Sequence, residues 1–215
     1  MMVRINTTAT TTGAITRRDV TLSALTAANK TYDGTVSASI TAGSVATGIA
    51  GEALSVSGSG SFADKNAGTG KTVTVADVSS LNKINGTGDW GNYNLATTGA
   101  MSTTANIAQA ALIVTASAVS KTYDATLAAG GSGVVGTLAG AGDLVNSVGT
   151  QAFLDKNAGT GKTVRASGVT IKDASNADVT GNYLISYVDN TGGVINRAPL
   201  QVTTTSVTKT YDGTL

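Results

Sequence analysis

The sequence has no cysteine and no histidine, and only one proline among 215 residues. Without cysteine the chain cannot form disulfides, zinc–thiolate sites or a cysteine nucleophile. Without histidine it lacks the commonest general base and metal ligand. Because these absences exclude most hydrolase and metalloenzyme arrangements, we expect no enzymatic activity, no cofactor and no bound metal.

Charged and aromatic side chains are also scarce. Charged residues make up 13% of the chain and aromatic residues 4%, with a net charge of +1, whereas about 25% charged residues is usual. This charge gives no electrostatic basis for binding nucleic acid. No apolar run reaches the roughly 18 residues of a membrane-spanning helix. We therefore expect neither a nucleic-acid partner nor a membrane span in this segment.

Internal repetition is the most prominent feature of the sequence. NKTYDGT at 29–35 recurs as SKTYDAT at 120–126 and as TKTYDGT at 208–214. DKNAGTGKTV occurs at 64–73 and again, unchanged, at 155–164. Gly-Asn-Tyr at 91–93 also returns at 181–183. Lys30 and Lys121 are 91 residues apart, which predicts a module of this approximate length.

The repeats divide the chain into four segments. Residues 1–14 are interpreted as the tail of a preceding module, 15–106 as the first module and 107–194 as the second. Residues 195–215 then open a third, truncated module. The chain is therefore expected to be a window on a longer array, with neighbouring modules as its partners.

Short strands are indicated throughout, and helix signals are poor. Stretches of alternating or apolar residues of strand length lie between clusters of Gly, Asn, Asp and Ser, which is typical of an all-β fold. The expected strands include 20–24, 71–75, 112–116, 183–188 and 200–204.

Each module repeats one set of three aromatic residues, which we expect to anchor its core. Burying such a ring contributes roughly 1.5–3 kcal/mol. The predicted anchors are Tyr32, Phe62 and Tyr93 in the first module, and Tyr123, Phe153 and Tyr183 in the second.

The GTGKT core of the repeated decapeptide resembles a phosphate-binding loop but departs from it. Lys65 and Lys156 stand where that loop requires glycine, and the following residues have a strand pattern instead of a helical one. The alternative is a hairpin whose two glycines adopt positive φ and whose Asp64 carboxylate accepts backbone N–H groups. The residues assigned this structural role are Asp64, Asn66, Gly68, Gly70, Asp155, Asn157, Gly159 and Gly161.

The Lys-Thr-Tyr-Asp-Gly-Thr motif is interpreted as a turn built on Lys30 and Asp33, and on Lys121 and Asp124. Ala125 replaces the glycine in the second copy. This replacement predicts that φ is not strongly positive at the position.

The same residue types raise two alternatives, an isopeptide bond and a calcium site. Lys30 or Lys121 could form an isopeptide bond with an asparagine near a buried carboxylate. An acidic loop in the second module could bind calcium, which prefers oxygen ligands. Its candidate ligands are Asp173, Asn176 and Asp178.

The repeated motifs together resemble the YDG-type repeat of large bacterial surface proteins of the filamentous haemagglutinin-like adhesin group. The resemblance covers essentially the whole chain. It implies an extracellular protein on the Gram-negative cell surface, exported by two-partner secretion, in which the modules form a stalk or display segment. It also implies β-sandwich-like, immunoglobulin-like modules, with β-grasp-like modules as the alternative.

A second function is that a module itself binds a host glycan or protein through variable loops. Trp90 is the candidate ligand-facing residue, because it is the only tryptophan and the second module has no counterpart. A buried loop anchor is the other interpretation of Trp90.

Overall fold

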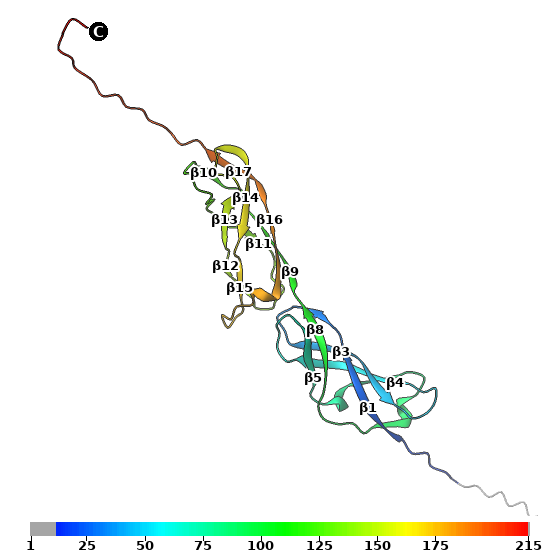
Figure 1. The fold of residues 1–215 in the computed structure, drawn as a ribbon. Helices are drawn as coiled ribbons and strands as arrows, with labels where there is room; N and C mark the ends of the chain where they lie inside the picture. The colour runs from blue at the N-terminus through cyan, green and yellow to red at the C-terminus, as the bar shows by residue number, and fades with distance from the viewer. Residues whose placement is uncertain (1–11, 215) are drawn as a thin grey trace, which may run out of the picture. The chain divides into compact units, whose positions relative to one another are not determined.

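The computed structural model describes residues 12–214, which form two compact units (Figure 1). The first unit contains the described residues up to Ala110 together with two short later segments, Ala139–Asp143 and Gly181–Tyr183. The second unit contains Ala111–Leu138, Leu144–Thr180 and the described residues from Leu184 onward. Segments of the second module therefore belong to the first unit.

The first unit is built from one sheet and two single-turn 3₁₀ helices. Seven strands lie side by side in the order β2-β8-β5-β4-β3-β1-β7. The eighth strand, β6, pairs with β4 outside this order. The pairs β1–β7 and β2–β8 are parallel. The elements are β1 (Arg18–Ala27), β2 (Lys30–Thr31), β3 (Ser37–Ala46), β4 (Leu54–Phe62), β5 (Gly68–Val75), η1 (Val78–Ser80), β6 (Asn82–Asn85), η2 (Trp90–Asn92), β7 (Tyr93–Leu95) and β8 (Met101–Ala108).

The core of the first unit follows from alternation along these strands. In β1, Val20 and Leu22 are buried while their neighbours are exposed. A register irregularity between Leu22 and Ala24 then moves the next buried position to Leu25. Such a bulge adds one residue to a strand and so restores an apolar side chain to the core face.

The second unit has three smaller sheets. Their orders are β10-β17-β14-β13, β11-β9-β16 and β12-β15. The elements of this part of the chain are β9 (Ala110–Thr115), β10 (Ser120–Thr122), β11 (Val134–Val135), β12 (Leu144–Ser147), β13 (Thr150–Phe153), β14 (Gly159–Ser167), β15 (Thr170–Lys172), η3 (Thr180–Asn182), β16 (Tyr183–Val188) and β17 (Asn190–Asn196).

The same four-strand order occurs in both units. β2-β8-β5-β4 of the first corresponds to β10-β17-β14-β13 of the second. In each case the motif lysine pairs in parallel register with an isoleucine, Lys30 with Ile107 and Lys121 with Ile195. The repeated motifs therefore lie on equivalent strands of the two sheets.

The all-β prediction is confirmed, and four of the five expected strands lie within observed ones or overlap them. Residues 71–75 lie in β5, 20–24 lie in β1, 183–188 form β16, and 112–116 overlap the second half of β9. The expected strand at 200–204 is wrong, because these exposed residues form no strand. A strand is stable only when it pairs and buries one face.

Helical structure in residues 12–214 is limited to three 3₁₀ helices of three residues each. A β-grasp module packs a helix on its sheet, so the described units do not match that alternative. No helix in this part of the chain is long and apolar enough to cross a membrane. The predicted tail of a preceding module, residues 1–14, lies mostly outside the described residues.

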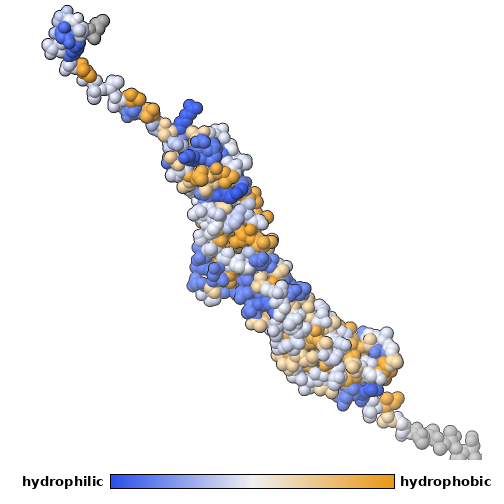
Figure 2. Space-filling view, in the orientation of Figure 1, coloured by the Kyte–Doolittle hydropathy of each residue, from blue (hydrophilic) through white to orange (hydrophobic). Residues whose placement is uncertain are grey.

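Figure 2 shows that much of the visible surface of both units is of intermediate hydropathy. Serine, threonine and glycine have such intermediate hydropathy. On β3 and β4, for example, Ser39 pairs with Ser59 and Ser37 with Ser61. The sheets therefore present small polar side chains in place of charged ones.

Candidate functional site

The Lys-Thr-Tyr-Asp-Gly-Thr motif forms a compact turn at the end of β2. The Lys30 ammonium donates to Asp33 Oδ1 and to the Thr35 carbonyl, each at 2.8 Å. It also lies 5.5 Å from the centre of the Phe62 ring. Burial opposes ionisation of Asp33, but the bonds from Lys30 and Thr35 outweigh it and hold the pKa of Asp33 below its usual value.

The second copy repeats this cluster. The Lys121 ammonium donates to Asp124 Oδ1 and to the Thr126 carbonyl at 2.8 Å, and lies 5.5 Å from the centre of the Phe153 ring. The hydrogen bond from Lys121, with those from Thr126, lowers the pKa of Asp124 to about 2. The lysine is therefore committed to the turn in both modules.

The third copy shows that the turn is a local structure. Asp212 Oδ1 accepts from Thr214 N–H at 3.0 Å and lies 2.9 Å from Lys209 Nζ, although no strand is present there. The motif thus encodes its own turn, in which a carboxylate accepts from the backbone two residues later.

The prediction that φ is not strongly positive in this turn is wrong. The φ values are +78° at Gly34, +63° at Ala125 and +83° at Gly213. Alanine is tolerated because Asp124 Oδ1 accepts from both N–H and Oγ of Thr126 at 2.9 Å and so fixes the turn. An L-residue in this region is disfavoured by roughly 1–2 kcal/mol.

The repeated decapeptide forms a hairpin loop between β4 and β5. Asp64 Oδ1 accepts from Asn66 N–H at 2.8 Å, as predicted, and from Lys71 Nζ at 2.6 Å. Both bonds lower the pKa of Asp64, and the bond from Lys71 has the larger effect. β5 continues through the region where a phosphate-binding loop requires a helix.

The second hairpin matches the first, with one correction common to both. Asp155 accepts from Asn157 N–H at 2.9 Å and pairs with Lys162. Only the second glycine of each loop has positive φ, +60° at Gly70 and +66° at Gly161. Gly68 and Gly159 instead begin strands β5 and β14, and a register irregularity follows each of them.

A buried network joins Tyr32 to the two later segments of the first unit. Asp143 Oδ2 accepts from the Tyr32 hydroxyl at 2.9 Å and from the Tyr183 hydroxyl at 2.8 Å. The two rings meet edge to face with centres 5.5 Å apart. Asp143 Oδ1 is buried and has no hydrogen-bond partner among the described residues.

Burial and the neighbouring carboxylate both favour the neutral phenol in this network. Burial is the larger cause, and with the bond to Asp143 it raises the pKa of Tyr32 strongly. The same causes raise the pKa of Tyr183 to about 12. Both tyrosines are therefore structural hydrogen-bond donors at neutral pH.

The hairpin and the turn of the first unit each contact one of these two segments. Ala67 N–H donates to Asn182 Oδ1 at 2.8 Å, and the Asn182 amide donates to Asn66 at 3.1 Å. The Ala141 N–H donates to the Asp33 carbonyl at 3.0 Å. The turn and the hairpin together thus form one covered surface, which we name the motif surface.

Five of the six predicted aromatic anchors are buried, and Tyr123 is not. Tyr32, Phe62, Tyr93, Phe153 and Tyr183 are at most 4% exposed. Tyr123, in contrast, is 37% exposed. The prediction for Tyr123 is wrong because its ring lies on the motif surface of the second unit, where no segment of that unit covers it.

Trp90 is a buried anchor and does not face solvent. It is 8% exposed, and its indole N–H donates to the carbonyls of Ser55 and Ile84 at 3.1 Å. Lys83 Nζ lies over the ring at 5.3 Å. The ligand-facing interpretation of Trp90 is therefore not supported.

Candidate residues for the isopeptide bond and for the calcium site bond to their own turns. Lys30 Nζ donates to Asp33 and to Thr35, and among residues 12–214 no bond joins it to an asparagine. Asp173 accepts from its own loop, at Ser175 and Ala177. Within residues 12–214 no group of three acidic, histidine or cysteine residues is placed to hold a metal.

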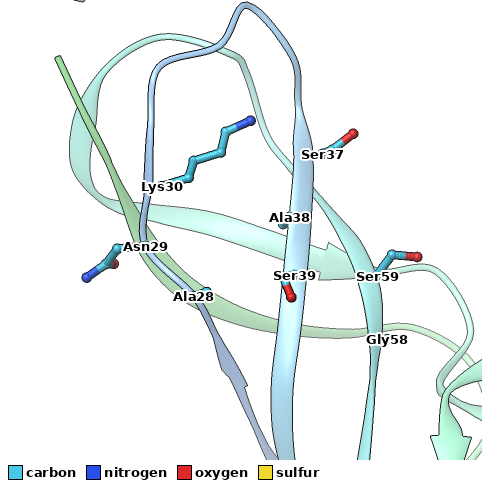
Figure 3. Close-up of a pocket in the computed structure, with 8 residues that line it drawn as sticks. All are labelled: Ala28, Asn29, Lys30, Ser37, Ala38, Ser39, Gly58 and Ser59. Atoms are coloured by element: carbon cyan, nitrogen blue, oxygen red, sulfur yellow. The ribbon is translucent and has the colours of Figure 1, made fainter. Parts of the chain in front are cut away.

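A shallow hollow of about 370 Å³ lies beside the first copy of the motif. Figure 3 shows Ser37 and Ser59 projecting from neighbouring strands, while Lys30 reaches toward the turn and Asn29 points away. Small hydroxyl side chains make this lining suitable for weak polar contacts. It offers no acid–base pair.

Sequence reasoning missed the acidic member of the network. Asp143 and its counterpart Glu52 stand 91 residues apart, the same spacing as the two motif lysines. In the first module Glu52 pairs with the Tyr93 hydroxyl, as Asp143 does with Tyr183. The presence of an acidic residue at the same position of both modules could have predicted this role for Asp143.

Comparison with known families gives one result. The sequence profile of the YDG domain matches residues 16–100 and 107–191, two tandem regions that cover most of the chain. No curated protein and no solved structure matches it.

Proposed function

The chain belongs to the YDG domain family, and we propose that it is a structural repeat segment of a large bacterial surface adhesin of the filamentous haemagglutinin-like group. In this role the units act as a stalk or display segment. The protein would be extracellular, held at the Gram-negative outer membrane and exported by two-partner secretion. It would have no enzymatic activity.

The observation that supports this role is the use of the signature residues. The lysine and aspartate of each motif bond to each other and to their own turn, in all three copies. The hairpin aspartates bond in the same way to Lys71 and Lys162. Side chains that bond within their own turn stabilise the fold. A binding or catalytic site, in contrast, presents polar groups to its ligand.

The second candidate is a module that binds a host glycan or protein, and the serine-lined hollow favours it most. Binding of the labelled chain to host cells and to a glycan array separates the two functions. The stalk predicts no saturable binding. Saturable binding that is lost in Ser59→Lys, but kept in the matched exposed variant Thr98→Lys, would establish the second candidate.

A further inference from the structure

The motif surface is covered in the first unit and open in the second. In the first unit Tyr32 is 1% exposed, and Asp33 and Gly34 are half-buried. In the second unit Tyr123 and the four residues after it are all exposed. Ala158, the counterpart of Ala67, is exposed as well, and with Tyr123 and Arg197 it lines a hollow of about 350 Å³.

The segments that cover the first surface have counterparts in the first module. Glu52 and Tyr93 pair with each other, as do Asp143 and Tyr183. The Gly91 carbonyl accepts from Arg17 at 3.1 Å, and the equivalent Gly181 carbonyl accepts from Gln109 at 2.9 Å.

These counterparts, which we name the front set, are not engaged in the same way. Asn182 is 4% exposed and bonds to the hairpin, whereas Asn92 is exposed. Among the residues that the structure describes, the motif surface of the second unit is therefore uncovered. The front set formed by Glu52, Asn92 and Tyr93 has an exposed asparagine and a half-buried carboxylate beside the buried Tyr93 ring.

We propose that the motif surface of the second unit docks the front set of another YDG module, and that a second copy of this chain can supply it. The Tyr123 hydroxyl donates to the Glu52 carboxylate, as Tyr32 does to Asp143. The Ala158 N–H donates to the side-chain oxygen of Asn92, as Ala67 does to Asn182. This inference rests on the proposed stalk role and deepens it, since it specifies how successive modules would join.

Ala125 makes this docking weaker than the contact in the first unit. A Cβ placed on Gly34 would lie 2.7 Å from the Ala141 nitrogen and 3.0 Å from Gly140 Cα. Ala125 carries that Cβ, so the backbone of a docked segment must shift to make room for it. The alanine therefore tunes the affinity of this surface, and Ala125→Gly is expected to raise it.

Cysteine crosslinking tests the proposal, because the natural chain has no cysteine. Chains carrying Ala158→Cys are mixed with chains carrying Asn92→Cys under mild oxidation, and the mixed disulfide dimer is quantified by mass. The matched control replaces the second chain with Thr98→Cys, an exposed position away from the front set. We expect several-fold more mixed dimer with Asn92→Cys than with Thr98→Cys.

Two variants check that the crosslink reports the docked geometry. Adding Tyr123→Ala to the Ala158→Cys chain is expected to reduce the yield to the Thr98→Cys level, and adding Ala125→Gly to increase it. Equal yields with Asn92→Cys and Thr98→Cys, with or without Ala125→Gly, would overturn the proposal. Since the assay contains no host ligand, its failure is distinguishable from discovery of saturable host binding, which would overturn the stalk role.

Discussion

At the residue scale, Ala125 and Gly34 occupy one turn position with different consequences. Both have strongly positive φ, but only Ala125 carries the strain of a side chain there. Gly34 is required twice, by its φ of +78° and by the close approach of the Ala141 nitrogen. The residue at this turn position is therefore strained in the second unit, whereas in the first unit only glycine fits.

Ala125→Gly is expected to stabilise the second unit by about 1 kcal/mol, because glycine relieves the positive-φ strain at a smaller cost in chain entropy. Gly34→Ala should destabilise the first unit by more than that. The only tryptophan, Trp90, lies in the first unit, so its fluorescence reports that unit alone, while circular dichroism reports both. A lower melting temperature in Ala125→Gly would contradict this account.

The Tyr32–Asp143–Tyr183 network predicts a loss of stability in alkali. The folded-state pKa of Tyr183 is raised from 10.0 to about 12, and that of Tyr32 is also raised. A raised pKa adds stability that is complete below about pH 10 and is lost as pH rises toward about 12. Urea midpoints measured by circular dichroism should fall across this range in the natural chain and fall less in Tyr32→Phe. An equal fall in both chains would indicate that Tyr32 has its ordinary pKa in the folded state, which would contradict the account.

At the element scale, the repeated hairpin is held by one carboxylate. Asp64 accepts from Asn66 N–H and from Lys71, and Asp155 accepts from the matching groups. Asp64→Ala should lower the stability of the first unit by about 1 kcal/mol, the typical contribution of a hydrogen bond. Asp155→Ala is the matched variant and should leave the Trp90 transition unchanged. No shift of that transition in Asp64→Ala would contradict the structural role of the loop.

The sequence predicted the features that depend on local pattern. The all-β fold, the strands at 71–75 and 183–188, and the Asp64 turn follow from alternation and turn chemistry, which act over a few residues. Tyr123 was misassigned because burial depends on what covers a side chain, and its sequence matches that of Tyr32. The strand at 200–204 failed for a related reason, because it has the pattern of a strand but no partner.

The candidate site was predicted in part. The motif lysines and aspartates were recognised as structural, but the network partner Asp143 lies 111 residues from Tyr32. Contacts over such a separation carry no local pattern. Alignment of the two modules pairs Glu52 with Asp143, and this shared acidic position would identify Asp143 from the sequence alone.

At the scale of the whole molecule, the chain is a tandem of YDG modules with low charge, no cysteine and polar surfaces of serine and threonine. In tandem arrays the stability is approximately a sum of module and neighbour contributions. A stalk built from such modules is therefore expected to unfold one module at a time when it is stretched.

Single-molecule force extension of this chain between terminal handles tests the stalk account most directly. Each matched region spans about 85 residues, which release roughly 300 Å of chain when fully extended. The account predicts two separate unfolding events with increments of this order. A single event, or smooth extension without a force peak, would contradict a structural stalk built from folded YDG modules.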